Sequence, residues 1–210
     1  MDEPFPGSVD AIEEIRASHE PPSRNAVLKE IVALDDNCRA FIAHSPFLVL
    51  ATAAADGRCD AAPKGGPPGF VRVLDDERLL IPEAPGNRRF DSLANLLENP
   101  RVGLLFCIPG LEETLRVNGD AWLTRDPDLL AQVELGGKAP KLAIGVRVEQ
   151  AYLHCGKAFR RSGLWRPDEW PDRSDMPSYA QMLRDHVADP AVTVEAIEAA
   201  SEESYTQRLW

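Results

Sequence analysis

The 210-residue chain lacks most of the short motifs that identify common enzyme classes. It contains no G-x-S-x-G nucleophile elbow, no Walker loop and no G-x-G-x-x-G dinucleotide motif. Its four cysteines lie far apart without a C-x-x-C pair, which disfavours a disulfide framework or a cysteine-based zinc site. We therefore expect buried thiols in a reducing compartment. Because the four histidines are scattered and the adjacent His154 and Cys155 point to opposite faces of a predicted strand, we expect no metal site.

Basic residues and long apolar runs are also scarce. Lysine and arginine number 23 against 34 acidic residues, which gives a net charge of −11. This balance argues against general binding to nucleic acids or acidic membranes, but it permits a small anionic ligand in a locally basic pocket. The longest apolar run, "FLVLATAAA", is about half of a membrane span. Since the first residues also lack the pattern of a secretion signal, we expect a cytoplasmic protein that binds neither nucleic acid nor membrane.

The periodicity of apolar residues divides the chain into three parts. Residues 1–45 form a predicted helical extension, in which residues 23–45 read as one helix with Ser23 as a possible cap. Ser45 and Pro46 should end that helix. Residues 46–165 have the period of strands, and residues 166–210 return to an irregular segment followed by helical patterns.

Turn residues within the central part predict a series of hairpins. Asp56-Gly57, the acidic run 75–77 and Pro109-Gly110 each separate two apolar runs. Residues 126–137 predict a short helix, and alternating apolar residues over 141–154 predict a half-buried strand. About six short strands with few helices between them indicate a mainly β fold with flanking helices, built on an antiparallel barrel.

The segment "GNRRFDSLANLLENP", residues 86–100, places two arginines where a helix is expected to begin. Asn87 is a suitable N-cap, which would put Arg88 and Arg89 in the first turn. Cations are disfavoured at this end of a helix dipole whereas anions are stabilised, so the arrangement predicts a bound anion. The alternative is a pair of solvated surface charges.

A second candidate lies in the glycine-rich segment "APKGGPPG". Lys64 stands there at the end of a predicted strand, and the glycines would let a ligand approach the backbone closely. Lysine and arginine bind phosphate through charge-assisted hydrogen bonds, which are about twice as strong as neutral ones. Lys64 could equally be an ordinary turn lysine.

These segments resemble those of a known family. The order and content of "APKGG", "LLIPEAPGNRR", "NPRVGLLF" and "LRVNG" are similar to the FMN-binding split-barrel family that includes pyridoxamine 5′-phosphate oxidase. The likeness covers about residues 40–165. The chain is more similar to the oxidase-related members than to the namesake enzyme. Proline and glycine replace the apolar run of the namesake's flavin strand. The Arg and His with which the namesake binds the phosphate of its vitamin substrate are not reproduced.

The resemblance implies a six-stranded split barrel that binds FMN as a homodimer, with the cofactor at the subunit interface and its phosphate at the arginine pair. By position in the matched segments, the cofactor residues would be Ala62, Pro63, Lys64, Gly65, Ile81, Pro82, Asn87, Arg88, Arg89 and Thr114. Thr114 would come from the neighbouring subunit. Four further residues would approach the cofactor or substrate from the partner chain: Lys157, Arg160, Arg161 and Trp165.

The function implied is that of an FMN-dependent oxidoreductase that transfers a hydride through flavin N5 to or from a small molecule. No residue stands out as a general acid or base, and Lys64 or Lys157 is the candidate for a positive charge near the flavin N1–C2 edge. The alternative is a carrier or sensor without turnover that holds FMN, a deazaflavin or haem. For haem, His154 or Cys155 would be the axial ligand. A third reading is a scaffold without cofactor.

Overall fold

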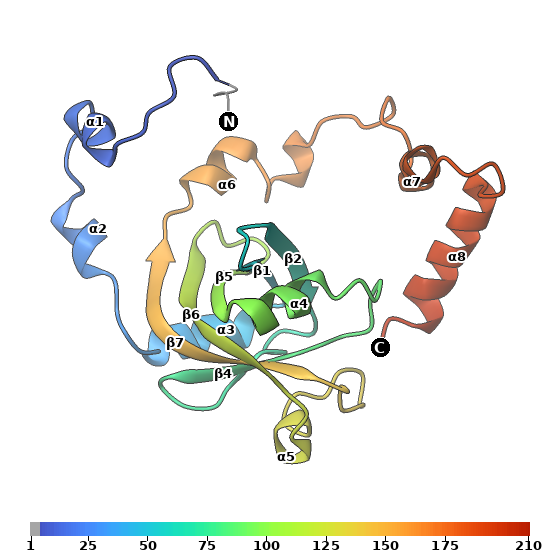
Figure 1. The fold of residues 1–210 in the computed structure, drawn as a ribbon, viewed down its shortest axis with the longest axis horizontal. Helices are drawn as coiled ribbons and strands as arrows, with labels where there is room; N and C mark the ends of the chain where they lie inside the picture. The colour runs from blue at the N-terminus through green and yellow to red at the C-terminus, as the bar shows by residue number, and fades with distance from the viewer. Residues whose placement is uncertain (1–4) are drawn as a thin grey trace.

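The computed structural model describes residues 5–210, so the first four residues of the predicted N-terminal extension lie outside it. Seven strands form a single antiparallel sheet in the order β2-β1-β5-β6-β7-β4-β3. The strands are β1 Phe47–Ala53, β2 Cys59–Gly65, β3 Arg72–Val73, β4 Arg78–Pro82, β5 Arg101–Cys107, β6 Thr114–Thr124 and β7 Ala143–His154. The mainly β fold with flanking helices is therefore confirmed (Figure 1).

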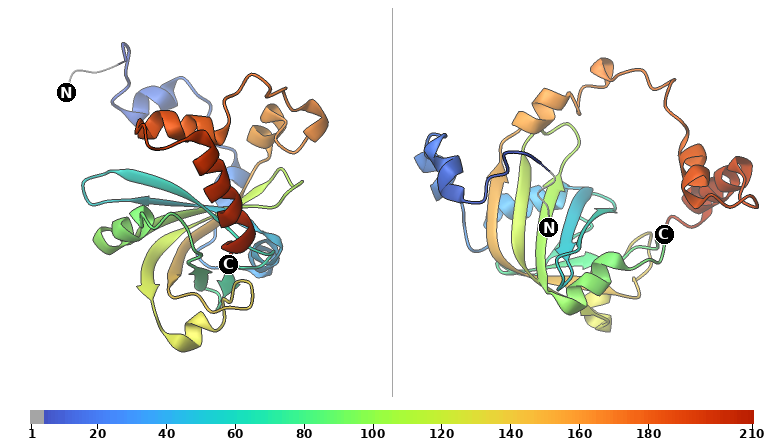
Figure 2. Two further views of the ribbon diagram at one scale, coloured as in Figure 1. Left: turned by 90° about the vertical axis from the view of Figure 1, so that its right-hand side faces the viewer. Right: turned by 45° about the horizontal axis from the view of Figure 1, so that its top comes forward.

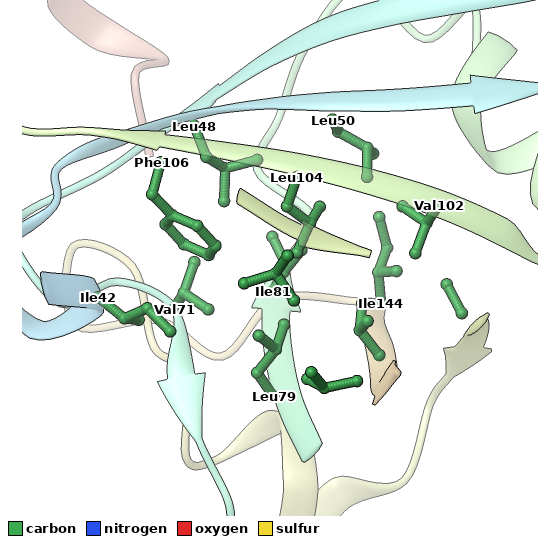
Figure 3. Close-up of a cluster of buried hydrophobic side chains, with 14 of the residues drawn as sticks. Ile42, Leu48, Leu50, Val71, Leu79, Ile81, Val102, Leu104, Phe106 and Ile144 are labelled. Carbon is green, nitrogen blue, oxygen red and sulfur yellow. The ribbon is translucent and has the colours of Figure 1, made fainter. Parts of the chain in front are cut away.

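The sheet curls around one apolar core. Alternate residues of its strands point inward, as strand geometry requires. Phe106, Leu48 and Leu104 face Leu79 and Ile81 of β4, and all five are buried (Figure 3). The expected closed six-stranded barrel is only partly confirmed, because β2 and β3 are sheet edges and hydrogen bonds between strands do not close the ring.

The predicted hairpin turns are confirmed. β1 and β2 are joined through Gly57, and β5 and β6 through Gly110. Both glycines have positive φ values, 88° and 83°, in the left-handed region that glycine enters without a steric penalty. The acidic run 75–77 joins β3 to β4.

The predicted single helix over residues 23–45 is wrong. Two helices replace it, α2 Arg24–Leu28 and α3 Asp36–His44, and α1 Ile12–Ala17 precedes them. Between α2 and α3 the backbone of Ile31 pairs with Ala151 of β7 instead of continuing the helix. The carboxylate of Asp35 then accepts a hydrogen bond from the Cys38 N–H and starts α3. The Ser23 cap of α2 and the helix end at Ser45 are confirmed.

The remaining helices follow the barrel strands or form the C-terminal part. They are α4 Asp91–Glu98, α5 Pro127–Leu130, α6 Lys157–Ser162, the 3₁₀ turn Pro167–Glu169, α7 Tyr179–Val187 and α8 Val194–Gln207. The one-turn helix α5 confirms the short helix predicted there, whereas α6 was not predicted.

Residues 164–210 form a C-terminal arm that leaves the barrel after α6. In Figures 1 and 2, α7 and α8 pack against each other and lie apart from the sheet. Only Ala180 and Ile197 are buried in this arm. The chain returns to the barrel at its last residue, where Trp210 lies against Gly136.

Candidate cofactor site

The candidate site lies along the edge strand β2. This strand pairs only with β1, so backbone N–H and C=O groups on its other side have no neighbouring strand. Asp60, Ala62 and Lys64 share its partly buried face, whereas Pro63 and Gly65 share the exposed face. The residues that the resemblance places on this strand are thus divided between its two faces.

The segment after β4 lies beside β2 and is joined to it by an ion pair. Lys64 Nζ lies 2.6 Å from Glu83 Oε2, and the two side chains are 14% and 20% exposed. This pair links the sheet edge β2 to the chain leaving β4, across the gap that the strand hydrogen bonds leave open. Lys64 is therefore a barrel-closing residue as well as a candidate ligand for an anion.

The two arginines precede α4 and do not lie in its first turn, so the predicted position at the helix start is wrong. Helix α4 begins at Asp91, and the side chain of Asn87 accepts a hydrogen bond from the Arg89 N–H instead of capping the helix. Arg88 and Phe90 have φ values of 60° and 61°. Left-handed residues other than glycine cost on the order of 1 kcal/mol or more and concentrate at functional sites.

The two arginines differ in their partners. Arg89 Nε lies 2.7 Å from Asp91, and this hydrogen bond together with the charge of Asp91 raises the pKa of the Arg89 guanidinium. Arg88 is exposed and forms no ion pair with a carboxylate of residues 5–210. Arg88 is therefore the cation of this loop that is available to an added anion.

A cavity of about 420 Å³ opens between the start of β2 and α4. This volume lies within the range of small-molecule sites. It is lined by Arg58, Cys59, Asp60, Arg89, Asp91, Ala94, Asn95 and Glu98. Because three carboxylates face two guanidinium groups in this cavity, its own charges are close to balanced.

Polar contacts fix α4 against the strands beside this cavity. Ser92 Oγ donates to Asp60 at 2.5 Å, and the buried Asn95 donates to Thr52 at 3.1 Å. The loop that carries the arginines is therefore attached to a helix that one hydrogen bond joins to β2 and another joins to β1.

Ile81 and Pro82 are fully buried. Their side chains belong to the core, so only their backbone could meet a ligand. The glycines of "PKGGPPG" also serve internal packing: a Cβ at Gly66 would lie 2.7 Å from the Phe70 side chain, and Gly69 has a φ of 78° against Ala43 O. At Gly66 and Gly69 the close approach is made by the protein itself, whereas at Gly65, the glycine expected to meet the cofactor, a ligand approach stays a prediction.

Thr114 lies at the start of β6, opposite His154 of β7, and is 3% exposed. Two strands, β1 and β5, separate β6 from β2 in the sheet. The structure of one chain therefore does not bring Thr114 to β2, and its expected role depends on a second subunit.

The predicted partner-side residues lie in and after α6. Arg160 pairs with Glu112 at 2.7 Å, and Trp165 donates to Leu111 O at 2.9 Å while its ring stacks on Phe159. These contacts attach α6 to the turn between β5 and β6. Lys157 and Arg161 are exposed.

The predictions for cysteines are half right. All four are free, but only Cys38 and Cys107 are buried, whereas Cys59 and Cys155 are exposed. Residues 5–210 contain no group of three or more His, Cys, Asp or Glu side chains arranged to hold a metal ion. Within the same range no helix has the length and apolarity needed to cross a membrane.

Sequence reasoning missed Glu83, Arg58 and Asp60. Glu83 stands inside the quoted segment "LLIPEAPGNRR", and its charge beside an apolar strand could have suggested a partner for Lys64. Arg58 and Asp60 flank the Cys59 that begins β2, and nothing in their spacing reveals that they line a cavity.

A family profile described as pyridoxamine 5′-phosphate oxidase matches residues 34–155. This range contains the curled sheet, α4 and the arginine loop. The chain belongs to the pyridoxamine 5′-phosphate oxidase family. Solved structures from several bacteria are similar to part of this chain, whereas comparison with curated protein sequences gives no match.

Three of these solved structures illustrate the range of the likeness. A putative pyridoxamine 5′-phosphate oxidase from Lactobacillus delbrueckii is 20% identical, with a TM-score of 0.45 over 58% of this chain and 99% of that chain. HupZ from Group A Streptococcus is 21% identical, with a TM-score of 0.44 over 56% and 91% of the two chains. The haem storage protein HutZ from Vibrio cholerae is 18% identical, with a TM-score of 0.40 over 58% and 93%.

Proposed function

We propose that this protein binds FMN and uses it as an oxidoreductase. The observation that carries the proposal is Arg88, which has no ion-pair partner among residues 5–210 and stands on a strained loop beside an edge strand. Arg88 and Arg89 would hold the phosphate, and the ribityl chain and ring would lie along the free side of β2.

The residues present fit this cofactor. Arg89 uses its Nε on Asp91 and keeps other N–H groups for a phosphate, and Arg88 forms no ion pair with a carboxylate of residues 5–210. Guanidinium groups bind phosphate oxygens in bidentate fashion. Asn87 fixes the loop through the Arg89 N–H.

The chemistry would come from the cofactor, which supplies hydride transfer at flavin N5 when bound. The protein would orient it and set the nearby charge. Lys64, held 2.6 Å from Glu83 and largely shielded from water, is the cation that could favour an anionic reduced ring. No side chain of the site is assigned as a general acid or base.

We also propose that the protein is a homodimer with FMN at the interface. Pro63 and Gly65 lie on the exposed outer face of the sheet, next to Val49 and Phe47 of β1. Thr114 is on the outer face of β6, because the adjacent Leu115 points into the core and neighbouring residues of a strand lie on opposite faces. A second copy packed on this outer face could bring its Thr114 to the first copy's β2.

A carrier or sensor without turnover is the second candidate. His154 keeps much of its surface exposed, but loss of some water contact, followed by the charges of Arg116 and Lys29, lowers the pKa of its imidazole. The neutral imidazole is the form that binds iron, so this histidine favours haem as the alternative ligand.

A visible spectrum of the purified full chain, before and after addition of FMN or haemin, separates these proposals. Flavin bands that remain after gel filtration support FMN, and a Soret band supports haem. Anaerobic reduction of the flavin by NADH or NADPH, followed by rapid reoxidation in air, would indicate an oxidoreductase. A bound flavin that no added electron donor reduces would indicate a carrier.

A further inference from the structure

The chain that leads from β4 into α4 is joined to the edge strand β2 at two points. Near the end of β2, Lys64 Nζ lies 2.6 Å from Glu83 Oε2. Near the start of β2, Ser92 Oγ donates to Asp60 at 2.5 Å. Lys64 follows Asp60 by four residues, which corresponds to roughly 13 Å along a strand. The loop that carries the arginines therefore runs beside β2 and is fixed to it at both ends.

The arginines belong to the Asp60 end of this loop. Arg88 and Arg89 stand only a few residues before Ser92 in the sequence. The hydrogen bond and charge of Asp91, followed by the charge of Asp60, raise the pKa of the Arg89 guanidinium, so Arg89 lies near the start of β2 in space as well. A phosphate held by these arginines would thus lie at one end of the loop, with the Lys64 ion pair at the other.

The ion pair at the other end is anchored by the backbone and shielded from water. The Glu83 N–H donates to Leu142 O at 3.0 Å, and the preceding Pro82 pairs with Ala143 of β7. The side chains of Lys64 and Glu83 are 14% and 20% exposed, and neither has a second ion-pair partner within residues 5–210. Because water reaches little of either group, a change in one charge is weakly screened and acts strongly on a neighbouring ligand.

We infer that Glu83 is a positioning residue for the flavin, which holds Lys64 in place and lowers the reduction potential of the ring by offsetting the lysine charge. The inference rests on the proposed FMN binding: with the phosphate at Arg88 and Arg89 and the cofactor extended along β2, the ring lies toward Lys64. A hydride taken from an electron donor brings two electrons and one proton, so the ring gains one negative charge. Lys64 stabilises that charge and Glu83 opposes it.

The test is the midpoint potential of FMN bound to the full chain, measured during anaerobic reduction by dithionite in the presence of a redox dye. Glu83→Gln keeps an oxygen that can accept a hydrogen bond from Lys64 but removes the negative charge, so it should favour the reduced flavin. Lys64→Met should favour the oxidised flavin. Each change should alter the equilibrium constant for reduction by about 10-fold, which is about 30 mV for a two-electron couple.

The double variant Lys64→Met/Glu83→Gln removes both charges and should return the potential close to that of the unaltered protein. Asp75→Asn is the matched control, because it removes the acidic partner of the exposed ion pair with Arg78 in the β3–β4 turn. It should leave the potential unchanged. Circular dichroism checks that each variant is folded, and the direction of either single variant alone is enough to decide.

A merely structural role for the pair would move both single variants in the same direction or move neither. Either result, with FMN still bound, would overturn the inference and leave the proposed FMN binding intact. A full chain that retains no FMN would refute both.

Discussion

At the scale of single residues, the proposed binding of FMN depends on which charged groups are free. Arg89 is engaged by Asp91, whereas Arg88 is exposed, unpaired within residues 5–210 and held at a φ of 60°. Strained backbone of this kind concentrates at functional sites, which supports the ligand that we propose at Arg88.

Replacing Arg88 by Met should weaken FMN binding by about 10- to 100-fold, because a hydrogen bond to a charged group contributes about 1.5–3 kcal/mol. Flavin fluorescence quenching measures the dissociation constant. Arg78→Met is the matched control, since Arg78 pairs with Asp75 in the β3–β4 turn. Equal losses in both variants would show that the effect is only one of overall charge.

The cysteines should separate into two classes by reactivity. Burial and the neighbouring Asp35 raise the pKa of Cys38 to about 11, and burial raises the pKa of Cys107. Since the thiolate is the reactive form, we expect these two thiols to react slowly with a disulfide reagent near pH 8. The exposed Cys59 and Cys155 should react first.

The absorbance of the thiol that the reagent releases should rise quickly by two equivalents per chain, one for each exposed cysteine. A Cys59→Ser/Cys155→Ser variant should lose this fast phase. Four equivalents released at one rate from the folded protein would contradict the burial of Cys38 and Cys107.

At the scale of elements, the ends of the sheet are joined by a side-chain contact rather than by strand pairing. Lys64 on β2 and Glu83 after β4 form this link, with most of both side chains shielded from water. Removing one partner leaves the other charge partly buried and unpaired.

Lys64→Met and Glu83→Gln should therefore each lower the free energy of unfolding by about 1–3 kcal/mol. The double variant should cost less than the sum of the two single variants, because neither charge is then left alone. Urea unfolding measures all three. Additive costs in the double variant would show that the two residues do not act as a pair.

The sequence predicts an element well where neighbouring residues determine it, and poorly where a contact with a distant segment does. The turns at Gly57 and Gly110 and the cap at Ser23 were predicted because each depends on neighbouring residues. The helix over 23–45 failed because Ile31 pairs with Ala151, a contact more than a hundred residues away. Helical spacing of apolar residues cannot reveal such a competing partner.

The candidate site shows the same division. The arginine pair was found from the sequence, but its loop conformation was not, since a cap at Asn87 and a start at Asp91 are both locally acceptable. Arg58 and Asp60, which line the cavity from another element, have no local signal. They enter the site only because the sheet curls and α4 packs on it.

At the scale of the whole molecule, the barrel and the extensions differ in packing and in charge. Residues 24–162 contain equal numbers of basic and acidic side chains, so the net negative charge resides in residues 1–23 and 163–210. The C-terminal arm buries only Ala180 and Ile197, whereas the inward side chains of the barrel are almost completely buried.

Hydrogen exchange should therefore be orders of magnitude faster in α7 and α8 than in β5 and β6, because local stability follows buried apolar contacts. Mass spectrometry of peptides from both regions measures this difference. Trp210→Ala should accelerate exchange in the arm further by removing its contact with Gly136. Equal protection in the arm and the barrel would show that another surface covers the arm in solution.

The most direct test of the central claim compares FMN with riboflavin, which lacks the phosphate but carries the same ring and ribityl chain. If Arg88 and Arg89 bind the phosphate, the full chain should bind FMN at least 100-fold more tightly than riboflavin, equivalent to about 2.7 kcal/mol. The preference should fall sharply at high salt, since the arginines are exposed. Equal affinity for the two flavins, or no affinity for either, would contradict the account.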